Sequence, residues 1–173
     1  MRYTIDTDRL ILRGFVEADS EVLKNNWKYY ISINSNKSNQ EIMDATNKWI
    51  EDYRTNSLTW VAENKLTHST VGNIGVIKRN YKHNYCELGY SVCEQYWGQG
   101  YATEMLKAII QHLFVEEDIH VIEAKHYENN IASGRVMVKA GMIKEATLKE
   151  RRYNGYLDKY MDLVCYCIMN PSH

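Results

Sequence analysis

The chain has 173 residues, 45% of them apolar and 25% charged, which is ordinary for a single globular domain over residues 1–173 with a sizeable core. Its formal net charge of −1, with no basic run, argues against nucleic acid as a partner. No apolar run is long enough to span a bilayer, and the N-terminus lacks the apolar core of a signal peptide. We therefore expect no membrane partner and a cytoplasmic location.

Apolar periodicity and turn signals predict strands that alternate with helices. In chain order we predict a strand at 8–15, a helix at 18–30, a second helix after residue 38, strands at 58–63, 70–78 and 85–92, a helix ending near residue 115, a strand at 120–126, a helix at 130–140 and a final hairpin. Ser38 with Glu41 makes a capping box, and Asn154-Gly155 is the strongest two-residue hairpin signal. Val22 is expected to face inward, together with Leu23 and Trp27.

The four cysteines match no common zinc pattern, and the chain has no Cys-x-x-Cys. Cys165 and Cys167 lie in an apolar strand, where buried free thiols are common. His120 and His126 share a predicted strand, but a solitary pair is a poor metal site. We therefore expect reduced, structural cysteines and no metal.

A predicted strand runs into two glycines that open directly into an amphipathic helix. Gly98 and Gly100 let the backbone turn tightly and approach a ligand without a Cβ in the way. The helix start after them offers unpaired N–H groups and the positive end of a dipole, which suits a phosphate or pyrophosphate. A strand-to-helix turn with glycines for geometry alone is the alternative. No Gly-Lys-Ser/Thr follows, and the third glycine of a dinucleotide fingerprint is missing.

The wider pattern resembles a known family. Residues 95–100, Gln-Tyr-Trp-Gly-Gln-Gly, fit the Gln/Arg-x-x-Gly-x-Gly/Ala signature of the GNAT superfamily of N-acetyltransferases. Residues 87–90, Glu-Leu-Gly-Tyr, and 96–104, Tyr-Trp-Gly-Gln-Gly-Tyr-Ala-Thr-Glu, resemble the branch that acetylates ribosomal-protein N-termini. The resemblance covers nearly the whole chain.

This resemblance implies the α/β acyl-CoA N-acyltransferase fold, a mixed, mostly antiparallel sheet with a splayed central strand pair flanked by helices. It also implies acetyl-CoA as the acetyl donor. The residues that match the family's donor site are Val92, Gln95, Gly98, Gln99, Gly100, Tyr101, Ala102, Thr103 and Asn130. The amide of Val92, or that of its neighbour Cys93, is then the expected donor to the thioester carbonyl, at a bulge where the strand splays open.

A second motif, residues 130–141, resembles the family's Asn-x-x-Ser…Lys-x-Gly-Phe segment. Asn130 and Ser133 are residue types that also serve as helix caps. Helical spacing places Ser133 on the buried stripe with Met137. In the resembling branch the matching serine is placed to hydrogen-bond the departing CoA thiolate, while many members carry a tyrosine acid where Met137 stands. Ser133 is therefore the expected acid.

Glu87 is the expected general base. It lies in a central strand on the same face as Gly89 and Ser91, where partial burial would raise the pKa of a carboxyl towards the working pH. The alternative is a glutamate paired with a lysine or arginine.

We expect direct acetyl transfer in a ternary complex, because no Cys and His stand in a pattern that argues for a covalent intermediate. The expected acceptor is a protein or peptide N-terminal amine, such as that of a ribosomal protein, and the enzyme is a monomer or homodimer. The alternatives are a small amine (polyamine, amino acid or aminoglycoside) or a non-catalytic acyl-CoA-binding module. Asp19, Glu21, Glu41 and Asp44 could attract an amine, or belong to a solvated helix face.

Overall fold

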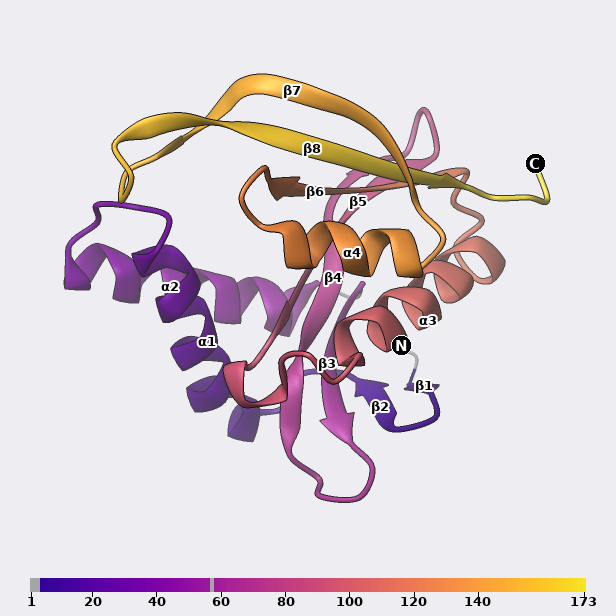
Figure 1. The fold of residues 1–173 in the computed structure, drawn as a ribbon. Helices are drawn as coiled ribbons and strands as arrows, with labels where there is room; N and C mark the ends of the chain where they lie inside the picture. Colours follow the sequence, from indigo (N-terminus) through magenta and orange to yellow (C-terminus); the bar gives the residue numbers. More distant parts are fainter. Residues whose placement is uncertain (1–3, 57) are drawn as a thin grey trace.

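The computed structural model describes residues 4–56 and 58–173 (Figure 1). Within them the elements are β1 (Ile5–Asp6), β2 (Leu10–Arg13), α1 (Ser20–Ser32), α2 (Asn39–Thr55), β3 (Thr59–Asn64), β4 (Thr70–Asn80), β5 (Tyr85–Val92), α3 (Tyr101–Val115), β6 (Val121–Tyr127), α4 (Ile131–Lys139), β7 (Ile143–Asn154) and β8 (Lys159–Met169). Short 3₁₀ turns precede α1 and follow β5. None of the described helices is both long and apolar enough to cross a membrane.

The strands form one sheet in the order β1-β2-β3-β4-β5-β6-β8-β7. Among the described strands only β5 and β6 pair in parallel, as expected for strands joined by the α3 crossover. Their pairing ends at Leu88 and Ala124, although β5 continues to Val92 and β6 to Tyr127. The two central strands therefore separate over their last residues. This confirms the mixed sheet with a splayed central pair.

The register irregularity between β4 and β5 lies on β4, whereas the bulge was expected on β5. Between β4 and β5 the register shifts at Val76 and Lys78, which leaves Ile77 without a partner. An extra residue of this kind bends its strand and increases the local twist. Val92 instead stays paired with Gly72, so β5 separates from β6 without a bulge of its own at that point.

Helices α3 and α4 cover one face of the sheet, while α1 and α2 pack on the other (Figure 1). Trp60 and Val61 are neighbours on β3 and both are fully buried, but Trp60 belongs to the core under α3 and Val61 to the core under α1. The buried stripe of α3 recurs at helical spacing, as predicted. Its members are Met105, Leu106, Ile109, Ile110 and Leu113.

The local cap signal predicts the start of α2 correctly. Ser38 accepts the amide hydrogen of Glu41 and the reciprocal bond is present, which confirms the capping box of α2. Gly141 has φ +92°, the left-handed conformation that glycine commonly adopts just after a helix. Val22 differs from its prediction, because it is more than a third exposed while Leu23 and Trp27 are buried.

The final hairpin turns differently from the prediction. Its loop is four residues long, 155–158, and the left-handed residue is Asp158 with φ +50°. Asn154 donates from Nδ2 to Oδ1 of Asn34 at 3.2 Å, so the hairpin end rests on the loop between α1 and α2. Asn154 Oδ1 also accepts the Leu157 amide at 3.0 Å, so bonds within the loop and to Asn34 both stabilise the longer loop.

Candidate functional site

The gap between β5 and β6 lies beneath the start of α4. Tyr90 and Val92 pack towards the core under α3 and α4, whereas Ser91 faces α1. This alternation is the period-2 geometry of a strand. Side chains at the end of β5 therefore point to two sides of the sheet, one towards the glycine turn and α4 and the other towards α1.

The backbone of the glycine turn has the conformation that the sequence predicted. Gly98 has φ +73° and Gly100 has φ +83°, both in the left-handed region that disfavours side chains. Gly100 caps α3 and has no side chain to bond the first amides of that helix. A Cβ built on Gly98 would meet no atom within 4 Å, so the turn leaves open space for a ligand. These features fit a pyrophosphate group.

A salt bridge that the sequence did not reveal holds this turn in place. Arg9 donates to Glu104 on α3 from Nε at 2.8 Å, and to the carbonyl of Gln99 in the turn from Nη1 at 2.9 Å. The Arg9 guanidinium also lies 4.2 Å from the ring centroid of Tyr101. Glu104 additionally accepts from Thr7 Oγ1 at 2.6 Å. Burial opposes ionisation of Glu104, but the bonds from Thr7 and Arg9 outweigh it and lower the pKa of this carboxyl.

Backbone geometry distinguishes the two proposed carbonyl donors. The Cys93 amide donates to the carbonyl of Val71 on β4 at 2.8 Å and is engaged. Hydrogen-bonded and non-hydrogen-bonded pairs alternate in an antiparallel ladder. The Val92 N–H therefore points away from β4, towards the side where β6 has diverged. Trp97 Nε1 donates to the Val92 carbonyl at 2.6 Å, which fixes the peptide between Val92 and Cys93.

Ser133 contacts a tyrosine that the sequence analysis did not single out. The Tyr90 hydroxyl lies 2.9 Å from Ser133 Oγ and 3.1 Å from the Ser133 carbonyl oxygen. Burial raises the pKa of Tyr90 to about 12, although the bond to Ser133 opposes this. Asn130 accepts the Ser133 amide at 3.2 Å, so it caps α4. The sequence feature that could have pointed to this contact is the Glu-Leu-Gly-Tyr motif, because Tyr90 is its last residue.

Glu87 forms the ion pair that the sequence analysis left as an alternative. Lys125 Nζ lies 2.6 Å from Glu87 and 3.1 Å from Glu123. Burial alone would lower the pKa of Lys125, but the two carboxylates raise it above its usual value. Glu87 faces away from Tyr90, so the structure does not bring Glu87 and Ser133 together on one face of β5.

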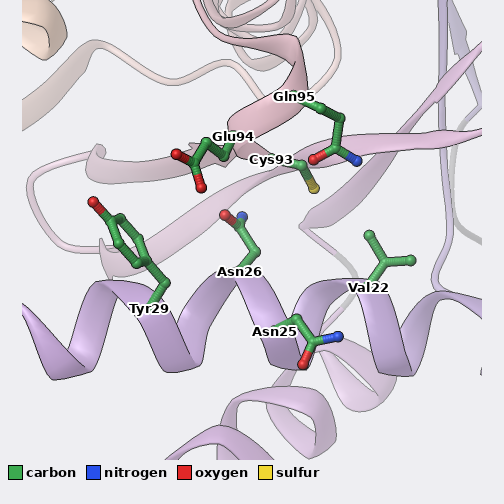
Figure 2. A pocket seen from close by; sticks show the side chains of 7 residues that line it. All are labelled: Val22, Asn25, Asn26, Tyr29, Cys93, Glu94 and Gln95. Carbon is green, nitrogen blue, oxygen red and sulfur yellow. The ribbon is translucent and has the colours of Figure 1, made fainter.

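A pocket of about 300 Å³ lies between α1 and residues 93–95 (Figure 2). Figure 2 shows Asn26, Tyr29 and Glu94 projecting into the space between the helix and the turn. Asn26 Nδ2 donates to Ser91 Oγ at 2.8 Å, which ties the pocket wall to the end of β5. The remaining lining residues are Val22, Asn25, Cys93 and Gln95.

The acids proposed from the sequence lie outside this pocket lining. Asp19 is buried and paired with Arg13 at 2.8 Å, so it is unavailable to an amine. Glu41 serves the capping box of α2, and Asp44 accepts from Gln40. Glu94 is the one carboxylate among the residues that line the pocket.

The described residues contain no group of three or more metal-ligating side chains. The four cysteines are free and buried. Burial raises the pKa of Cys93 to about 11, so this thiol beside the pocket remains protonated near neutral pH.

The mixed sheet with its splayed central strand pair, followed by a glycine turn at a helix start, is the architecture of an acyl-CoA N-acyltransferase. The sequence profile described as the acetyltransferase (GNAT) domain matches residues 9–143. The chain therefore belongs to the GNAT acetyltransferase family. It is an N-acetyltransferase that uses acetyl-CoA as its acetyl donor.

Two curated relatives show the range of similarity. The chain is 26% identical to the uncharacterized N-acetyltransferase YoaA of Bacillus subtilis, over 96% of this chain and 97% of the relative. It is 32% identical to the [ribosomal protein uS5]-alanine N-acetyltransferase of Escherichia coli, over 46% of this chain and 41% of that protein.

Two solved structures share the fold. A ribosomal L7/L12 alpha-N-protein acetyltransferase, RimL, in complex with coenzyme A has a TM-score of 0.77 and 19% identity, covering 99% of this chain and 100% of that one. A chimera of spermidine N-acetyltransferase SpeG from Vibrio cholerae has a TM-score of 0.76 and 22% identity, covering 95% and 98% of the two chains.

Proposed function

We propose that this enzyme acetylates the α-amino group of a protein or peptide N-terminus, such as that of a ribosomal protein. The observation that carries the proposal is the pocket beside the end of β5, in which Glu94 is the single lining carboxylate. One carboxylate matches one ammonium, whereas a polyamine presents several positive charges. The similarity to the alanine N-acetyltransferase of ribosomal protein uS5 points the same way. A cytoplasmic location follows from such a substrate.

In this proposal acetyl-CoA binds at the glycine turn before α3 and in the gap between β5 and β6. The open backbone at Gly98 and the amides of Tyr101, Ala102 and Thr103 would hold the pyrophosphate. Gln95 and Gln99 support this turn, because Gln99 Nε2 donates to the Gln95 carbonyl at 3.0 Å. The pantetheine arm would follow β5 past Asn130 at the start of α4.

Transfer is direct in this proposal. The neutral amine attacks the thioester carbon from the α1 face, and the Val92 N–H stabilises the developing oxyanion. When the C–S bond breaks, the electron pair stays on sulfur and Ser133 Oγ donates a hydrogen bond to it. The raised pKa of the Cys93 thiol makes it a poor nucleophile and supports transfer without an acyl-enzyme.

Glu87 is proposed as the base that removes the proton from the amine. It lies on the face of β5 shared with Ser91, the residue that contacts the pocket wall through Asn26. The positive charge of Lys125 competes for this carboxylate at 2.6 Å. The proton taken from the amine would therefore be held by Glu87 while the Lys125 ammonium stays hydrogen-bonded to the same carboxyl group.

The test is a release assay for the CoA thiol with a panel of acceptors. Peptides with N-terminal alanine or serine are compared with spermidine, free amino acids and an aminoglycoside. We expect the highest kcat/KM with a peptide, and blocking its N-terminus should abolish turnover. A preference for spermidine would replace the peptide proposal with the polyamine one. Tight acetyl-CoA binding without turnover on any amine would indicate a non-catalytic binding module.

A further inference from the structure

Tyr90 occupies a particular place in the sheet. The last residue of β5 that pairs with β6 is Leu88, and Tyr90 lies two residues further on. Its ring packs on the face of the sheet covered by α3 and α4, beside the point where the strands separate, and its hydroxyl reaches the first turn of α4 at Ser133. The gap is where the proposed thioester would lie, so this hydroxyl pair is close to the reacting atoms.

The two hydroxyls have two ways to share their hydrogens. In one, Tyr90 donates to the Ser133 carbonyl at 3.1 Å and Ser133 Oγ donates to the Tyr90 oxygen at 2.9 Å. In the other, Tyr90 donates to Ser133 Oγ, which leaves the Ser133 hydrogen free for another acceptor. Both arrangements use the same heavy-atom positions and differ only by rotation of the two O–H bonds.

We propose that Tyr90 is a positioning residue for Ser133 and switches between these two arrangements during the reaction. As the C–S bond breaks and the electron pair moves to sulfur, Ser133 turns its hydrogen to the thiolate. Tyr90 then turns its own hydrogen from the carbonyl to Ser133 Oγ. No proton leaves either residue, and water later protonates the released thiolate. This inference rests on the proposed role of Ser133.

The acidity of the phenol agrees with a hydrogen-bond role. The pKa of Tyr90 is raised to about 12 by burial, whereas the pKa of an ordinary thiol is about 8.5. Full proton transfer from this phenol to a thiolate would be unfavourable by roughly three orders of magnitude. The same raised pKa keeps Tyr90 protonated, and able to donate, at any ordinary assay pH.

A double-mutant cycle tests the inference. Tyr90→Phe, Ser133→Ala and the double variant are compared in single-turnover assays, with Tyr85→Phe at the far end of β5 as the matched control. Each single variant should lower the rate by about tenfold or more with acetyl-CoA affinity unchanged. The double variant should fall within about twofold of Ser133→Ala, because Tyr90 acts through Ser133.

The outcomes separate the two proposals. If Ser133→Ala keeps the full rate, the proposed role of Ser133 fails. If Ser133→Ala is slow but Tyr90→Phe is as fast as Tyr85→Phe, or if the two losses multiply, the inference about Tyr90 is overturned. Thermal unfolding of each variant verifies the fold.

A second measurement does not depend on removing the phenol. A fluorinated tyrosine at position 90 keeps the ring but ionises at lower pH, and a phenolate cannot donate. The rate should then fall as pH rises through the lowered phenol pKa, and this loss should disappear in the Ser133→Ala background. A flat profile in the fluorinated enzyme would overturn the switch.

Discussion

Lys125 Nζ lies 2.6 Å from a carboxylate oxygen of Glu87, and this ion pair joins β5 to β6 beside the point where the strands separate. Glu87 pairs in register with Glu123, and Lys125 lies one residue beyond Ala124, the last residue of β6 that pairs with β5. The Glu87–Lys125 ion pair therefore links β5 and β6 where the gap between them begins. It also places a cation next to the carboxylate that we propose as the base.

Glu87→Gln should lower turnover. The amide cannot take a proton from the amine, while the donor site on the opposite face of β5 is unchanged. The measurement is kcat together with acetyl-CoA affinity, which we expect to be preserved. Glu123→Gln, which removes the other partner of Lys125, is the matched control. An unchanged kcat in Glu87→Gln would place the base elsewhere.

Gly98→Val should abolish acetyl-CoA binding while the chain stays folded. The side chain would occupy the open space beside the turn, and the left-handed φ of +73° adds a strain of about 1–2 kcal/mol. Gly141→Ala is the control, because φ there is +92° at a distant helix end. It should lose similar stability and still bind acetyl-CoA. Equal affinity in Gly98→Val and the wild type would refute the assignment of the turn.

Acetyl-CoA affinity should fall in acid as Glu104 is protonated. The pKa of this carboxyl is lowered in the folded protein, so its stabilisation is complete above the unfolded value of about 4.5 and is lost as pH falls through the folded value. Protonation weakens the bonds from Arg9 that hold the turn. Glu104→Gln should flatten this acid dependence and cost about 1–3 kcal/mol of unfolding free energy at pH 7.

The control for this prediction is Glu116→Gln, an exposed carboxylate just beyond the other end of α3. Its removal should change neither the affinity nor the acid dependence. If Glu104→Gln and Glu116→Gln behave alike in denaturant titrations, Glu104 does not support the turn.

Features set by neighbours in the chain were predictable. The glycine turn, the α3 stripe and the Ser38 capping box each depend on residues within about one helical turn. Features set by distant residues were not. Arg9 and Glu104 are 95 positions apart, and nothing local indicates that Arg9 supports the turn.

Contacts between distant residues also explain where the structure differs from the sequence-based predictions. Asp19 looked like a surface acid, but Arg13 and Thr70 draw it into the interior. The hairpin loop is longer than the Asn154-Gly155 signal predicts, and Asn154 is bonded to Asn34 on a distant loop. Tyr90 and Ser133 are 43 positions apart, and only the fold brings the start of α4 against β5.

Glu94→Gln should raise the KM for the amine without changing the KM for acetyl-CoA. Glu94 lines the pocket from the turn, and its charge would pair with the ammonium of the arriving N-terminus. Because Glu94 is exposed, the effect should be modest, about 1 kcal/mol or roughly fivefold in KM. Added salt should shrink the difference between wild type and variant, since an exposed ion pair is screened.

Glu21→Gln is the matched control for this last prediction, because Glu21 is an exposed acid on α1 that does not line the pocket. Steady-state kinetics on a short peptide at low and high salt separate the two. A long-range attraction by the general acidity of this surface would raise the KM equally in both variants. A specific acceptor contact raises it in Glu94→Gln alone, and that difference would place the substrate ammonium between α1 and the turn.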